Sequence, residues 1–152
     1  MLAAGQVIDA MATRITGLAL AGSRVYTSRA WPLSVEDLPA WRVLAADEDV
    51  EPVTVHPDAL QSHRLQVELH GVARAVANLD DALHALAAQA LAAIFDTTPP
   101  SDALNTIASK LQVTLRRIER DMAKEGEAAV GLVTLTLRVI FRTRASAPET
   151  LV

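Results

Sequence analysis

Glu68 and His70 are the residues of this chain whose types and spacing come nearest to a chemical site. Two positions apart on a strand, they point to the same face, where a carboxylate and an imidazole could bind a divalent metal. No third ligand is evident nearby, and a solvated sheet face or a subunit contact explains the pair as well. We therefore expect no catalytic residue, no metal site and no cofactor. A small metal- or ligand-binding enzyme domain that uses this pair is the weaker alternative.

The other histidines and the paired carboxylates have simpler explanations than chemistry. His63 and His70 are seven residues apart, which on a strand places them on opposite faces. His84 lies in an apolar helical pattern and is expected at the boundary of the core. Glycosidase-type carboxylate pairs need a cleft lined by aromatic residues, and the chain has only two Trp, one Tyr and two Phe. The acidic pairs therefore indicate loops and a helix N-terminus.

Motifs for nucleotide binding and acyl transfer are absent from the sequence. The six glycines are scattered and form neither a dinucleotide-binding fingerprint nor a Walker loop. Ser23 follows Gly22, but Val25 stands where a nucleophile elbow needs glycine. The absence of cysteine excludes disulfides and thiol nucleophiles. The N-terminus is typical neither of a signal peptide nor of a transmembrane span, so we expect no membrane association.

Charge is divided unevenly along the chain. Residues 110–144 hold eight basic and four acidic side chains, a net of +4, so the remainder of a chain with net charge −4 carries −8. The basic segment could be a solvated strand face, a nucleic-acid patch without aromatics for base stacking, or an assembly surface. One basic and one acidic surface suit head-to-tail contact, which closes into a ring when the rotation allows. The candidate interaction residues are Asp47, Glu48, Asp49, Glu51, Arg116, Arg117, Arg120, Arg138 and Arg142.

Hydrophobic periodicity predicts the elements that would position these residues. An apolar stripe predicts a helix from about residue 3 to 20, and Asn78 is a good N-cap for a second helix over 79–95. Alternating patterns predict strands at 24–29, 41–46, 63–76, 111–122 and 132–143, with a bulge at Gly71. Helix remains the alternative for 111–122. We expect 47–58 to be an extended, exposed charged connection or an edge hairpin, and we expect one or two helical turns from Ser101 to Lys110.

These elements predict an α+β fold with two layers. Each helix has one apolar stripe, so both must pack on one face of an antiparallel sheet of four to five strands. Residues 1–145 are expected to form a single domain, and residues 146–152 a flexible C-terminal tail.

Several stretches follow the order and spacing of one protein family. They are the amphipathic first helix, Glu36-Asp37-Leu38-Pro39-Ala40 leading into Trp41-Arg42-Val43, the acidic loop Asp47 to Glu51, the alternating strand Arg64 to Leu69, the helix Leu79 to Phe95 and the strand Leu132 to Thr143. Together they cover most of residues 5–143. In this order the chain resembles the lambda-like tail terminator proteins of long-tailed phages, the minor tail protein U family.

The resemblance implies a mechanical function. Members of the family form a hexameric ring on the finished tail tube, end its polymerisation and present a surface to the head-completion protein. It implies as partners further copies of this chain, the major tail tube protein and the head-completion or connector protein, with DNA only passing through the lumen. It also implies assembly in the host cytoplasm and a final place in the virion tail. Another phage neck or head-tail connector protein is the alternative within this class.

Overall fold

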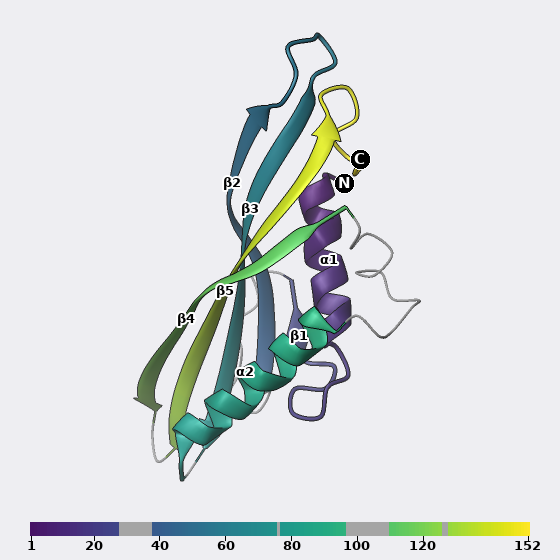
Figure 1. Ribbon diagram of the computed structural model, residues 1–152. Coiled ribbons are helices and arrows are strands. Elements are labelled where there is room, and N and C mark those ends of the chain that lie inside the picture. Colours follow the sequence, from purple (N-terminus) through teal and green to yellow (C-terminus); the bar gives the residue numbers. More distant parts are fainter. Residues whose placement is uncertain (28–37, 76, 97–109, 126–127) are drawn as a thin grey trace.

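The computed structural model describes residues 1–27, 38–75, 77–96, 110–125 and 128–152 (Figure 1). The helical turns predicted from Ser101 to Lys110 lie outside these ranges, except for Lys110 itself. The elements in chain order are α1 (Ala3–Ile15), β1 (Val25–Tyr26), β2 (Ala40–Pro52), β3 (Leu60–Ala75), α2 (Leu79–Phe95), β4 (Gln112–Glu125) and β5 (Ala128–Arg144).

The predicted α+β architecture is confirmed. The five strands form one sheet in the order β1-β2-β3-β5-β4, and α1 and α2 lie on the same face of it (Figure 1). β1 pairs in parallel with β2, so the sheet is mixed, whereas the other neighbours are antiparallel. The segment at 111–122 is a strand, as favoured, because β4 supplies the antiparallel partner that β5 needs on its far side.

Two local predictions are corrected by the structure. The first helix ends at Ile15 and not near residue 20, because Thr16 is extended and Gly17 has a positive φ of 86°. No bulge occurs at Gly71: the β3–β5 ladder runs unbroken from Leu60 to Ala75. The bulges lie instead between Ala45 and Glu48 on β2 and between Leu115 and Arg117 on β4.

Of the two alternatives predicted for 47–58, the structure shows the hairpin, so the acidic run at 47–51 is part of a strand and not of the loop that the resemblance implied. β2 continues through Pro52 because β3 begins early enough to pair with it, with Asp49 opposite Arg64 and Val50 opposite His63. The low strand propensity of acidic residues is overridden by this ladder and by opposite charge across the two strands. β2, β3 and the end of β5 therefore extend as an arm beyond the start of α1 (Figure 1).

The core is aliphatic with two large aromatic side chains. Trp41 and Phe141 are almost fully buried among Leu, Val, Ile and Ala side chains from both helices and from β2, β3 and β5, and partly buried residues of β4 pack against them. Asn78 caps α2 as predicted, its side-chain oxygen accepting from the Asp81 amide at 3.4 Å.

The C-terminal residues, expected to be flexible, are packed in this structure. Leu151 is buried, the Val152 amide donates to Arg142 O at 3.0 Å, and the Ala3 amide donates to Pro148 O at 3.2 Å. Lys110 Nζ also donates to Leu151 O at 3.0 Å. The two ends of the chain therefore lie together against β5 (Figure 1).

Arg14 joins the two helices. It lies in the last turn of α1 and is buried, and its Nη1 donates to Ala93 O at 2.8 Å and to Asp96 O at 2.7 Å. Carbonyl groups at a helix C-terminus have no partners within the helix and carry partial negative charge. The guanidinium group therefore caps α2 from the neighbouring helix.

We expect Arg14→Met to lower the free energy of unfolding by about 2 kcal/mol, because it removes two charge-assisted hydrogen bonds and leaves buried carbonyl groups without them. Urea unfolding followed by circular dichroism measures this change. Arg14→Lys keeps the charge but not the planar donor group, so its free energy of unfolding should lie between those of the wild type and Arg14→Met. Equal stability of Arg14→Met and the wild type would contradict the capping role.

Two glycines allow α2 to lie close to the sheet. A Cβ atom at Gly71 would stand 2.8 Å from the Trp41 ring and 3.0 Å from Leu86 Cδ2. A Cβ atom at Gly131 would meet only the ends of leucine side chains, Leu83 Cδ1 at 2.8 Å and Leu79 Cδ2 at 3.0 Å. A buried indole ring is less able to move than a leucine side chain. Gly71 should therefore tolerate an added methyl group less well than Gly131.

Gly71→Ala should therefore destabilise the protein by about 1–2 kcal/mol through overpacking. Gly131→Ala should be nearly neutral, because the gain in strand rigidity offsets the small shift of the leucines. Thermal and urea unfolding of the two variants side by side provide the measurement. The opposite ranking would show that the Trp41 contact does not limit the packing.

Candidate functional site

The two faces of the sheet differ in chemistry. The inner face packs against both helices and carries buried residues such as Leu65, Val67 and Leu69 of β3. The outer face is the face turned away from the helices, and on β3 it carries Arg64, Gln66, Glu68 and His70. Any contact made through the outer face is therefore polar and charged.

A shallow hollow crosses the outer face where β2, β3, β5 and β4 run side by side. Its volume is about 200 Å³, and its lining includes charged and polar residues from all four strands: Asp47, Asp49, Arg64, Gln66, Arg116, Thr136 and Arg138. Four of the nine predicted interaction residues thus come together here. Of these four, the acidic residues stand on β2 and the arginines on β4 and β5, while Arg64 of β3 adds a positive charge beside the acidic residues.

The remaining predicted residues lie around this hollow or on the other face. Glu51 Oε1 accepts from Arg64 Nη1 at 3.1 Å, and Arg117 Nε lies 2.5 Å from Glu119 Oε1. Arg142 is exposed and lies opposite Ser62 on the outer face. Glu48 pairs with Leu65, and Arg120 with Val133, which places both on the inner face. Consecutive residues of a strand point to opposite faces of the sheet, so neighbouring charged residues in the sequence are distributed between the inner and the outer face.

Glu48 belongs to a polar network with His63 that the sequence did not reveal. Glu48 Oε1 lies 2.6 Å from His63 Nδ1, and His63 Nε2 lies 2.8 Å from the hydroxyl of the fully buried Thr143. The imidazole ring stacks on Phe141 with 4.7 Å between centroids. Because the carboxylate only accepts, the Nδ1 proton is directed at Glu48. The seven-residue spacing from His70 correctly predicted the face, but the partners come from other strands.

Glu68 and His70 form the contact that their spacing predicted. Glu68 Oε2 lies 3.0 Å from His70 Nε2 on the outer face, and Gln66 Nε2 donates to Glu68 Oε1 at 3.3 Å. Over the described residues, no group of three or more His, Cys, Asp and Glu side chains is placed to hold a metal ion. Among the helices in the described ranges, none has the length and apolar character to cross a membrane.

Arg64 is the outer-face residue that sequence reasoning missed. Its alternation with Gln66 and Glu68 predicted its face, but its role depends on β2 lying beside it. Arg64 stands opposite Asp49, contacts Glu51 and lines the hollow. It therefore balances part of the acidic charge of β2 within the same chain.

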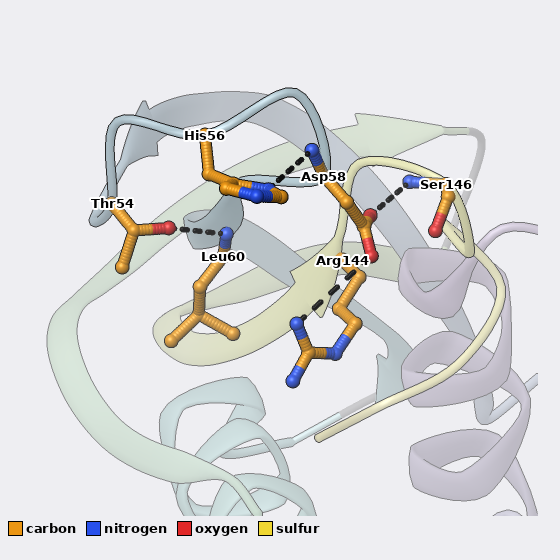
Figure 2. A network of polar contacts seen from close by, with 6 residues as sticks. All are labelled: Thr54, His56, Asp58, Leu60, Arg144 and Ser146. Carbon is orange, nitrogen blue, oxygen red and sulfur yellow. Dashed lines mark hydrogen bonds and ion pairs between the residues drawn. The ribbon is translucent and has the colours of Figure 1, made fainter.

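The tip of the arm, residues 53–59, is braced by contacts with the end of β5 (Figure 2). Asp58 Oδ1 accepts from the Ser146 amide at 3.0 Å, and Arg144 Nη1 stands 4.0 Å from Asp58 Oδ2. The Ala145 amide also donates to Ala59 O at 2.9 Å. Hydrogen bonds from Ser146, its side chain first and its backbone second, hold the pKa of the Asp58 carboxyl below its ordinary value, with a smaller effect of Arg144.

Protonation of Asp58 should release the tip. The pKa of the Asp58 carboxyl is lower in the folded protein than in the unfolded chain. The contact with Ser146 therefore stabilises the fold fully at pH values above the unfolded-state pKa, and this stabilisation is lost as the pH falls through the folded-state pKa. We expect Asp58→Asn to accelerate hydrogen exchange of the Ser146 amide at neutral pH. The exposed Asp9 on α1 provides the control, since Asp9→Asn should leave this amide unchanged. A Ser146 amide that exchanges equally in both variants would contradict the bracing role.

No family model matches the chain, and no curated protein matches it. A solved chain described as "Virion of native gene transfer agent (GTA) particle" is similar at a TM-score of 0.45 and 19% identity, covering 93% of this chain and 92% of that one. A likeness at this level concerns the course of the backbone and carries no functional argument.

Proposed function

We propose that this chain is a structural protein of phage or prophage assembly that caps the tail tube as a ring, ends tube polymerisation and offers the head-joining surface. The proposal starts from the resemblance of the sequence to the tail terminator family. The observation that carries the proposal is the separation of charge across one sheet. Asp47 and Asp49 stand on β2 and Arg116 on β4, at opposite sides of the outer face.

This separation favours association between copies in one direction. A surface that is acidic at one side and basic at the other is complementary to the next copy of itself placed head to tail. Head-to-tail contacts generate a ring when the rotation between copies closes, and a hexamer is the number implied by the family. A ring of this kind can match the end of a tube built from repeated subunits.

The proposed partners follow from this role. The ring would contact the major tail tube protein on one side and the head-completion or connector protein on the other, with DNA passing through its lumen. Acidic residues in the lumen would repel the phosphate backbone and let the DNA pass. Assembly would take place in the host cytoplasm and end in the virion tail. We propose neither an enzymatic activity nor a cofactor.

The test uses tail tubes assembled from the tube protein of the same genome. Added wild-type protein should form a ring at one tube end and shorten the tubes in negative-stain images. Arg116→Glu/Arg117→Glu should reduce the fraction of capped tubes about tenfold or more, because like charges would then face each other between copies. Arg74→Glu, the same type of change at an exposed position of β3 far from the hollow, should cap normally.

Two results would overturn the proposal. Unchanged capping by the charge-reversed protein at physiological salt would remove the role of the basic side. The second result is that the wild type does not bind tubes but forms rings that bind only the head-side connector protein. The chain would then be another protein of the phage neck.

A further inference from the structure

β4 is an edge strand of the sheet. From Gln112 to Glu125 it pairs with β5, and among the described strands it has no neighbour on its other side (Figure 1). Residues 116–122 are all exposed to solvent, so neither face of this part of β4 is covered. An unpaired edge presents a row of N–H and C=O groups that can pair with another strand. This part of β4 is therefore accessible to a strand from a second molecule.

The inner face of this edge exposes apolar side chains. Ile118 is 37% exposed and Met122 is 50% exposed, although both are on the face of the sheet that carries the core. Arg120 stands between them on the same face. Apolar side chains exposed on an edge strand favour association, because a second strand removes their surface from water.

The outer face of β4 carries its charges in a defined order. Two basic residues, Arg116 and Arg117, are followed by two acidic residues, Glu119 and Asp121. In an antiparallel pair, the first half of one strand lies beside the second half of the other. The basic half of one β4 would then lie beside the acidic half of a second β4. The strand is therefore complementary to itself in the antiparallel orientation.

The charges also select one register for this pairing. In a symmetric antiparallel pair one residue lies opposite its own copy, and like charges placed opposite each other are destabilising. Ile118 is the only uncharged residue from 116 to 121. Within this stretch, only a pair centred on Ile118 avoids a charged residue opposite its own copy.

In this register the opposite charges meet on the outer face. Arg117 of each copy lies opposite Glu119 of the other copy, on both sides of the twofold axis. Within one copy, Arg117 Nε already lies 2.5 Å from Glu119 Oε1. The four charged groups would therefore form a square in which opposite charges are neighbours and like charges occupy the diagonals.

We propose that two copies of this chain associate through β4, as an antiparallel pair with a twofold axis at Ile118. The two five-stranded sheets then continue into each other through an interface that is the same on both copies. This inference goes beyond the proposed function, because it concerns the free protein and does not require that the protein caps a tube. The dimer covers Arg116 and Arg117, so it competes with the proposed ring for the same arginines.

The absence of cysteine from the chain makes a cross-linking test clean. Ile118→Cys places the two thiols opposite each other, where the Cα atoms of an antiparallel pair stand about 4.5–5.5 Å apart, within the range of a disulfide. Under mild oxidation, this variant should form a covalent dimer about tenfold faster than Met122→Cys. Met122 is the more exposed residue, but its two copies would lie about 27 Å apart along the paired strands.

A charge exchange tests the register. Arg117→Glu and Glu119→Arg each place like charges across the axis, so each should raise the dissociation constant of the dimer about tenfold or more. An equimolar mixture of the two variants should dimerise as the wild type does, because one copy then supplies two acidic groups and the other two basic groups. Arg74→Glu, at an exposed position of β3, should also dimerise as the wild type does.

Sedimentation velocity over a range of protein concentrations measures the association, and circular dichroism verifies that each variant is folded. Three results would overturn the pairing. The first is a wild type that stays monomeric at every concentration, and the second is Ile118→Cys that cross-links no faster than Met122→Cys. The third is Arg117→Glu that dimerises as well alone as in the mixture with Glu119→Arg.

The outcomes separate this inference from the proposed function. If the dimer behaves as expected but the wild type caps no tube, the pairing stands and the tail-capping role falls. If tubes are capped and the dimer does not form, the capping role stands and the pairing falls.

Discussion

The close contact of α2 with the sheet is the constraint on which the rest of the structure depends. The helix reaches the inner face because Gly71 and Gly131 leave room for Trp41, Leu83 and Leu86. Both helices have a single apolar stripe, so they cover one face and leave the other polar. A core that is almost entirely aliphatic is sufficient for this two-layer packing, and the long strands extend past the helices as an arm without needing a second core.

The same constraint determines which surfaces remain for function. The inner face is occupied by the core and by the buried His63 network, whereas the outer face is left to carry charge. On the outer face, acidic side chains of β2 and basic side chains of β3, β4 and β5 line one hollow. The Glu68–His70 pair lies on the same face.

Contacts between distant segments complete the scaffold. Arg14 fastens the end of α2 to α1, the last residues of the chain lie against α1 and β5, and Ser146 braces the tip of the arm through Asp58. Each of these contacts joins groups separated by tens of residues. Together they connect the arm, the helices and the end of the chain to the sheet.

The sequence by itself determined the fold class, the helix at 79–95 with its Asn78 cap, the central parts of the long strands and the opposite faces of His63 and His70. These features follow from local periodicity and capping, which neighbouring residues encode. His84, expected at the boundary of the core, is instead exposed on α2. Only the tertiary structure decided that the acidic run is a strand, that Gly71 is a packing position rather than a bulge, and which charged residues meet across the hollow. Strand pairing and register join residues far apart in sequence, and no local pattern encodes which strands become neighbours.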